Sequence, residues 1–141
     1  MSDLTFCFLS CGEETEKDCL EAIRFERELG NFNFQEVRNV SPAVNALNKM
    51  FEQCETKYLV PLDCDMVMLH GYLDRIYREI ERAKGKRWHS ILFPLWDTLT
   101  KEKILALKVF NMELMRSIPY KDDACPDILH YQDMEAAGLR S

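Results

Sequence analysis

Apolar and polar positions follow two different periods along the chain, and their alternation predicts strands and helices in turn. Short apolar runs bounded by turn residues predict strands at 5–10, 32–40, 57–63 and 90–96. Between them, apolar residues spaced three and four apart predict helices from Thr15 to Gly30, from Ser41 to about Cys54 and from Gly71 to about Gly85. Alternating strands and helices are typical of the α/β class, with a mostly parallel sheet.

Two stretches of this pattern are less simple. The run at 57–63 is apolar almost throughout, so we expect a strand that is buried on both faces, although Pro61 removes a ladder donor there. Residues 101–117 fit either a helix that begins near Ile104 or a strand over 106–110 flanked by short helices, and periodicity does not separate the two. A last helix is expected from Pro126 to Gly138.

Composition and charge narrow the class of protein. A chain of 141 residues with 47% hydrophobic and 30% charged residues is expected to fold as a single domain over 1–141. The formal net charge of -6 argues against a broad surface for nucleic acid or for an anionic membrane, because such surfaces need clustered Lys and Arg.

The cellular compartment is predicted from two features that the sequence lacks, a basic secretory leader and a membrane-spanning segment. The apolar run at 4–9 has no basic leader, and no segment reaches the roughly 20 apolar residues that cross a bilayer. We therefore expect a cytoplasmic protein without a membrane span. The 6 cysteines include no CxxC pair, which favours reduced thiols over a disulfide or zinc framework.

Two carboxylates follow the apolar strand at 57–63. In open α/β sheets, ligands bind beyond the carboxyl ends of the strands, which is where Asp63 and Asp65 lie. If the backbone is still extended there, residues i and i+2 point to the same side, so both carboxylates can face one Mg²⁺ or Mn²⁺ ion. The alternative is a pair of solvated aspartates in the loop before Gly71.

The neighbourhood of these aspartates resembles a known family. The stretch ALNKMFEQCETKYLVPLDCDMVMLHGYLDRI, residues 46–76, is similar to the family 2 glycosyltransferases, which have the GT-A nucleotide-sugar fold. The positions that match are Asn48, Leu62, Asp63, Asp65, Gly71, Tyr72 and Leu73. The resemblance implies a single-domain, three-layer α/β/α protein of GT-A type, shortened relative to that family.

The resemblance also implies an activity. It points to an inverting glycosyltransferase that moves a sugar from a nucleotide-diphosphate sugar to an acceptor whose identity the sequence does not reveal. Mn²⁺ or Mg²⁺ would be held by Asp63 and Asp65, which would also contact the donor together with Asn48. The family places further nucleotide contacts in the loop after the first strand, here at Cys11 and Gly12.

A second segment resembles the family's acidic motif. CPDILHYQDMEAAGL, residues 125–139, looks like that motif followed by a helix, and it implies that Asp127 is the general base for the acceptor hydroxyl. Pro126 stands where the motif has its first acid. The alternative for Asp127 is an ordinary acid in the first turn of a helix, and other candidate bases are Asp122, Asp123 and Asp133.

Two other functions fit the same pattern. One is a GT-A-like binding or partner domain without catalytic activity, and the other is a nucleotidyltransferase, which also places acids around a metal and a nucleotide phosphate. Trp88, just before the strand at 90–96, and Trp96, at its end, fit either core packing or stacking against a sugar or base.

Overall fold

The computed structural model describes the backbone of residues 3–121 and 126–136. Strands and helices alternate along most of this chain, as the hydrophobic pattern predicts. In chain order they are β1 (Leu4–Ser10), α1 (Glu16–Leu29), β2 (Asn33–Arg38), α2 (Ala43–Gln53), β3 (Tyr58–Asp63), α3 (Tyr72–Ala83), β4 (Ser90–Asp97), β5 (Glu102–Asn111), α4 (Met112–Met115) and α5 (Pro126–Ala136).

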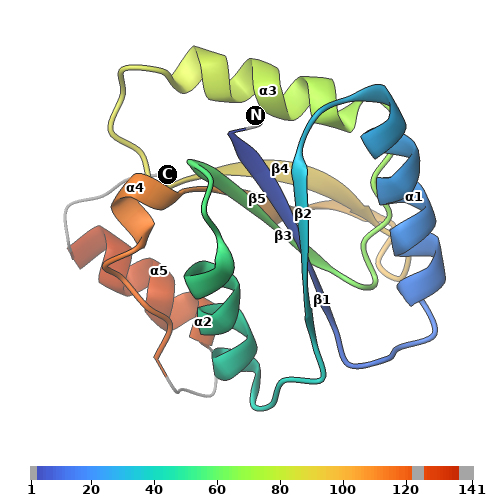
Figure 1. The fold of residues 1–141 in the computed structure, drawn as a ribbon, viewed down its shortest axis with the longest axis horizontal. Coiled ribbons are helices and arrows are strands. Elements are labelled where there is room, and N and C mark those ends of the chain that lie inside the picture. Colours follow the sequence, from blue (N-terminus) through green and yellow to red (C-terminus); the bar gives the residue numbers. More distant parts are fainter. Residues whose placement is uncertain (1–2, 122–125, 137–141) are drawn as a thin grey trace.

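The strands form one mixed sheet in the order β2-β1-β3-β5-β4 (Figure 1). β1 pairs in parallel with β2 and with β3, while β5 runs antiparallel to both β3 and β4. The three adjacent strands β2, β1 and β3 are therefore parallel, as the sequence predicted for most of the sheet. The antiparallel β4–β5 hairpin completes the sheet on the β3 side.

Helices cover both faces of the sheet, which gives the three layers that the sequence implied (Figure 1). α1 and α3 lie on one face, above a core that includes Phe6, Phe8 and Val60 from the strands. α2, α4 and α5 lie on the other face, above a second core that includes Leu59 and Phe110. β1, β3 and β5 each contribute buried residues to both cores, because successive side chains in a strand point to opposite faces.

The amphipathic helix α3 illustrates how the pattern produces this layering. Leu73, Ile76 and Ile80 are buried and lie one helical turn apart, so they share the face that packs on the sheet. Gly71 precedes the helix with a φ of +86°, a conformation that favours glycine.

The structure also settles the ambiguous stretches. The strand alternative for 101–117 was correct, but the strand runs from Glu102 to Asn111 and is followed only by the short helix α4. Pro61 is accommodated within the buried strand β3 because the β3–β5 ladder ends at Leu59, so it has no ladder bond to lose on that side. Helix α2 begins at Ala43, two residues later than the sequence suggested.

Candidate functional site

Topology brings most of the predicted site residues to one edge of the sheet. β1, β2 and β3 are parallel, so their carboxyl ends lie together, with Leu9 opposite Asp63 and Ser10 opposite Arg38 (Figure 1). Cys11 and Gly12 follow β1. Asp63 is the last residue of β3, and Asp65 lies two residues after it. We call this region the carboxyl edge.

The turn after β1 is held in one conformation by its own hydrogen bonds. Gly12 has a φ of +89°, and its N–H donates to Ser10 Oγ at 3.0 Å. The N–H of Cys11 donates to Glu13 Oε2 at 2.9 Å. Ser10 Oγ also lies 3.0 Å from carboxylate oxygens of both Glu13 and Glu16, and its single proton serves one of them at a time.

These contacts fix the ionisation of the turn. Hydrogen bonds from the Cys64 thiol, from backbone N–H groups and from Ser10 lower the pKa of Glu13 to about 2. Burial raises the pKa of Cys64 to about 11, with the Glu13 carboxylate adding to the shift. Glu13 is therefore anionic at neutral pH, while Cys64 keeps its proton and turns inward between the two exposed aspartates.

The two aspartates lie at the end of β3 and in the turn that follows it. β3 ends at Asp63, whose carbonyl accepts the N–H of Met66 at 2.9 Å. Cys64 and Asp65 belong to the turn, so the argument from an extended backbone, which would direct both carboxylates to the same side, does not apply. That both carboxylates bind one cation stays a prediction. Both side chains are exposed.

A cavity of about 420 Å³ opens at this edge between β1, β2 and α2. Its walls are mostly apolar, and its polar groups come from the β1 turn and from Asp63. We call it the β1–α2 cavity. Its lining residues are Leu9, Ser10, Cys11, Glu13, Val37, Val40, Ala43, Ala46, Leu47 and Asp63.

A smaller hollow of about 90 Å³ lies next to the first, on the same face of the sheet. The two share Leu9, Leu47 and Asp63. We call the smaller one the β3–β5 cavity. It brings Asp63 together with Lys108 and Tyr120, which the sequence analysis did not single out. A lysine within the otherwise apolar run of β5 was the available signal for Lys108.

Asn48 is placed differently from the other predicted donor contacts. Its Nδ2 donates to the carbonyl oxygen of Tyr120 at 2.8 Å, and its Oδ1 accepts the N–H of Tyr120 at 2.7 Å. The amide therefore clamps the backbone of the loop that lines the β3–β5 cavity. Asn48 has a positioning role in this structure, and its direct contact with a nucleotide stays a prediction.

Replacing Asn48 by Ala tests this role. The change leaves both backbone groups of Tyr120 without their partner, so we expect a loss of about 2 kcal/mol in the free energy of unfolding of the protein without ligand. Urea unfolding measures it. Asn45→Ala on the same helix is the matched control, because Asn45 is exposed and its side chain makes only a 3.4 Å contact. Equal stabilities of the two variants would contradict the clamp.

Tyr120 also connects the clamp to α5. Its ring stacks on His130 with centroids 3.9 Å apart, and His130 Nε2 donates to the carbonyl oxygen of Ile118 at 2.8 Å. His130 is buried, with only 1% of its surface exposed. Asp127 belongs to the first turn of this helix, but its side chain lies outside the described residues, as do those of Asp122 and Asp123.

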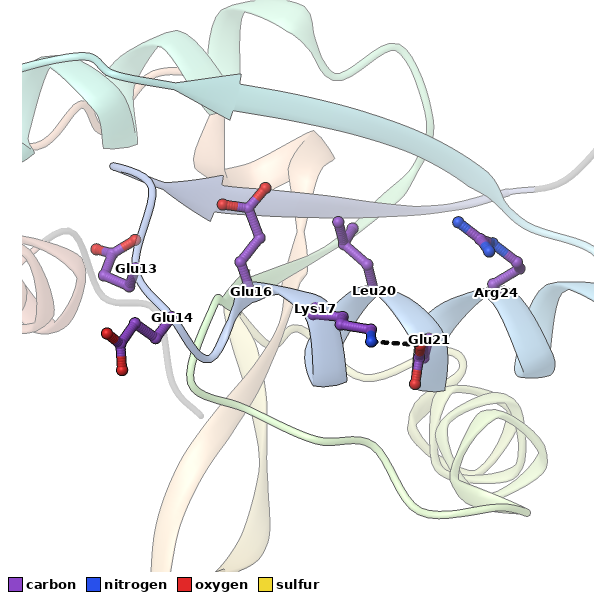
Figure 2. A pocket seen from close by; sticks show the side chains of 7 residues that line it. All are labelled: Glu13, Glu14, Glu16, Lys17, Leu20, Glu21 and Arg24. Carbon is purple, nitrogen blue, oxygen red and sulfur yellow. Dashed lines mark ion pairs between the residues drawn. The ribbon is translucent and has the colours of Figure 1, made fainter.

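A third hollow, of about 460 Å³, runs along α1 (Figure 2). Glu16, Leu20 and Arg24 point toward the strands, while Lys17 and Glu21 form an exposed ion pair at 4.0 Å. It is lined by neither Asp63 nor Asp65, and it shares only Glu13 with the β1–α2 cavity.

The described part of the chain has neither a clustered set of metal ligands nor a membrane-spanning helix. Residues 3–121 and 126–136 contain no group of three or more His, Cys, Asp and Glu side chains placed to hold a metal ion. Among the helices in those ranges, none is long and apolar enough to cross a membrane.

Comparison with known proteins identifies the fold. No family model and no curated protein matches the sequence. A mannosyltransferase from Pyrobaculum calidifontis, solved with GDP-mannose and Mn²⁺, superposes with a TM-score of 0.69 at 12% identity, over 98% of this chain and 53% of that one. Protein A197 from STIV superposes with a TM-score of 0.64 at 11% identity, over 94% and 78% of the two chains.

Nucleotidyltransferases share the same architecture. The 4-diphosphocytidyl-2C-methyl-D-erythritol synthase of Anaerococcus prevotii has a TM-score of 0.56 at 7% identity, over 96% of this chain and 84% of that one. The chain has a shortened GT-A-like fold and spans about half the length of the mannosyltransferase. The fold implied by the resemblance is confirmed, and membership of family 2 stays a prediction.

Proposed function

We propose that this protein binds a nucleotide-diphosphate sugar together with Mn²⁺ or Mg²⁺ at the carboxyl edge, and transfers the sugar to an acceptor with inversion. The observation that carries the proposal is the position of Asp63, which ends the central strand of a GT-A-like sheet and lines both cavities. The mannosyltransferase of similar fold was solved with GDP-mannose and Mn²⁺.

The β1–α2 cavity supports the binding of the nucleoside. Its volume of about 420 Å³ is within the usual range for small-ligand pockets, and its apolar walls suit a flat base. Asp63 and the β1 turn provide hydrogen-bonding groups at the rim for ribose hydroxyls or base edges. We propose that Cys11 and Gly12 contact the nucleotide from this turn.

The residues at this edge fit a divalent cation. The Asp65 carboxylate makes no hydrogen bond or ion pair with the residues that the structure describes. Mg²⁺ and Mn²⁺ usually complete their oxygen shell with water and substrate phosphates, so Asp63 and Asp65 are a sufficient contribution from the protein. When bound, the cation would offset the negative charge that develops on the leaving diphosphate.

Charge explains why the cation and the donor should bind together. The edge presents the carboxylates of Glu13, Asp63 and Asp65, which repel a diphosphate. Arg38 at the end of β2 is engaged in ion pairs with Glu16 and Glu36. We therefore expect weak binding of either ligand alone and much stronger binding of the two together.

The same turn argues against a nucleotidyltransferase. Between Ser10 and Glu16 the sequence contains no Lys or Arg, so a triphosphate at the end of β1 would face Glu13, Glu14 and Glu16. A diphosphate sugar carries less charge and is repelled less. The structure therefore favours the glycosyltransferase among the two enzyme classes.

The proposal is tested by thermal unfolding with nucleotides and metal. With Mn²⁺ present, a nucleoside diphosphate at about 100 times its dissociation constant should add about 2.7 kcal/mol to the free energy of unfolding. UDP, GDP and CDP should each be compared with the matching triphosphate. If none of these nucleotides at millimolar concentration raises the unfolding temperature, the remaining interpretation is a non-catalytic domain. A larger increase with the triphosphates than with the diphosphates would favour a nucleotidyltransferase.

Asp127 is proposed as the general base for the acceptor hydroxyl. The contacts of His130 with Tyr120 and Ile118 dock α5 beside the β3–β5 cavity, which supports this role for its first turn. Asp127→Asn should lower the rate of transfer by roughly 10²-fold or more while donor binding stays unchanged. Asp133→Asn on the same helix tests the rival base, and we expect it to keep the rate of transfer because Asp133 is ion-paired with Lys121 at 3.0 Å. Unchanged transfer in Asp127→Asn would exclude it as the base.

A further inference from the structure

The β4–β5 hairpin extends past the end of the strand beside it. β3 pairs with β5 only at Tyr58 and Leu59, whereas the β4–β5 ladder continues to the pair Asp97 and Glu102. Because β5 is antiparallel to β3, the far end of the hairpin lies at the carboxyl edge (Figure 1). The hairpin therefore forms a wall on the β3 side of the candidate site.

One face of this wall is the same face on which Asp63 lies. Phe93 and Leu95 pack into the core under α1 and α3, so Trp96 points to the opposite face, toward the side of α2 and α5. Leu59 packs into the core on that opposite side, and Asp63 lies four residues farther along the same strand. Trp96 and Asp63 thus share a face of the sheet.

That part of the hairpin face is apolar and open. Trp96 is 59% exposed and Leu105 is 66% exposed, with Pro94 paired to Leu105 across the strands. Lys103 is paired with Trp96 and provides a polar group beside the indole. We call Pro94, Trp96, Lys103 and Leu105 the hairpin platform.

The other tryptophan shows that this exposure is specific to Trp96. Trp88 is 7% exposed and stacks on Tyr58 with centroids 5.8 Å apart and the rings 5° from parallel. Core packing was therefore correct for Trp88 and wrong for Trp96. An indole that is left open next to a candidate transfer site needs a different explanation from packing.

We propose that the hairpin platform binds the acceptor, and that the acceptor is a neutral saccharide whose ring stacks on Trp96. The inference rests on the proposed function, since it assigns the acceptor class of the same site. An indole combines a flat apolar face with an edge N–H, which suits the apolar face and the hydroxyls of a sugar ring. Lys103 lies where it can reach those hydroxyls.

The register sets the length of the saccharide. Asp63 and Ala106 line the same small cavity, and Ala106 lies three residues along β5 from Lys103, which pairs with Trp96. Strand spacing and rise place the two backbones roughly 14 Å apart. This separation exceeds one sugar ring, so a di- or trisaccharide should bind better than a monosaccharide.

Other occupants fit the platform less well. An anionic membrane surface would meet the acidic carboxyl edge of a chain with a net charge of -6. A second copy of the chain that extended the sheet along the edge strand β4 would meet Pro94 and the irregular register between Phe93 and Pro94. A neutral ligand with many hydroxyl groups meets neither obstacle.

Tryptophan fluorescence tests the proposal without an assay of transfer. Titration with cellotriose, maltotriose or chitotriose should produce a saturable blue shift of the emission, and glucose should produce a weaker one. Trp96→Ala should remove the shift, while Leu99→Ala at the tip of the same hairpin, where Leu99 is 92% exposed, should keep it. Transfer to the accepted trisaccharide should then show a KM about tenfold higher in Trp96→Ala, with kcat little changed.

Two results would overturn the inference. One is the absence of any saturable change with these saccharides up to about 50 mM. The other is an emission shift with phosphatidylcholine vesicles and none with saccharides, which would assign the platform to a lipid surface. Donor binding is measured separately by thermal unfolding with Mn²⁺ and nucleoside diphosphates. A donor shift without a saccharide response rejects the acceptor inference alone, whereas no donor shift rejects the proposed function.

Discussion

Asp65→Asn is expected to abolish the Mn²⁺-dependent stabilisation by nucleoside diphosphates. The substitution keeps the size of the side chain and removes the charge that a hard cation requires. Asp65 is exposed and makes no hydrogen bond or ion pair with the described residues, so its replacement should leave the fold intact. The apparent affinity for the diphosphate should fall by at least about 100-fold, as measured by thermal unfolding with and without Mn²⁺.

The matched control for this experiment is Glu14→Gln. Glu14 lies in the turn after β1 and is exposed, but it lines the hollow along α1 rather than either cavity that contains Asp63 (Figure 2). The Glu14→Gln substitution removes one negative charge close to the same edge, so it measures how far a change in charge alone affects binding of the diphosphate. Asp65 would not be a metal ligand if both variants weakened binding equally, or if Asp65→Asn kept the Mn²⁺ dependence.

Phe6→Ala is expected to have the largest effect on stability. Phe6 lies in the middle of β1, is fully buried, and contacts the ring of Phe32 with centroids 4.7 Å apart. Truncating a buried Phe removes apolar contacts and leaves a cavity, which costs about 3–5 kcal/mol. This is a large share of the 5–15 kcal/mol that is typical of folded domains. Urea unfolding measures the loss.

Phe25→Ala provides the comparison for that loss. Phe25 is 51% exposed on α1, so its truncation creates no enclosed cavity and should change the free energy of unfolding by less than about 1 kcal/mol. Similar losses in the free energy of unfolding in Phe6→Ala and Phe25→Ala would mean that the core under α1 and α3 is not centred on β1. The comparison matters for function because β1 positions the turn that lines the β1–α2 cavity.

The carboxyl edge combines a nucleotide-sized cavity with an excess of acids. Glu13 is ionised at all physiological pH values, because the hydrogen bonds of the turn hold its pKa at about 2. This arrangement makes a cation the natural partner of any phosphate ligand at the edge. Lys108 contributes positive charge on the β3–β5 side, where it lines the smaller cavity with Asp63.

The sequence predicted the strand that carries these acids, but it did not predict the turn that orients the second of them. The apolar run that ends at Asp63 predicted a buried central strand with acids at its carboxyl end, and β3 is that strand. The turn at Cys64 and Asp65 was not predictable, because strand periodicity does not report where an extended backbone stops. The orientation of the second carboxylate therefore depends on the turn.

Asn48 shows that a contact between residues far apart in the sequence cannot be predicted from a local pattern. The resemblance placed it among the donor contacts, and its position on α2 brings it near the correct edge. Its partner, Tyr120, is 72 residues away in the sequence, so no local pattern could indicate that its amide binds that backbone. The same holds for Lys108, which lines a cavity together with Asp63 because β5 lies beside β3 in the sheet.

The sequence by itself determined the class of fold and the strand that carries the acids, because hydrophobic periodicity records which face of each element is buried. The tertiary structure decided which distant residues meet at the carboxyl edge, since that depends on strand order and register. It also decided that Trp88 is packed and Trp96 is open. Both lie close to the same apolar run in the sequence, but Trp88 packs into the core under α1 and α3, whereas Trp96 lies on the part of the hairpin that extends beyond β3.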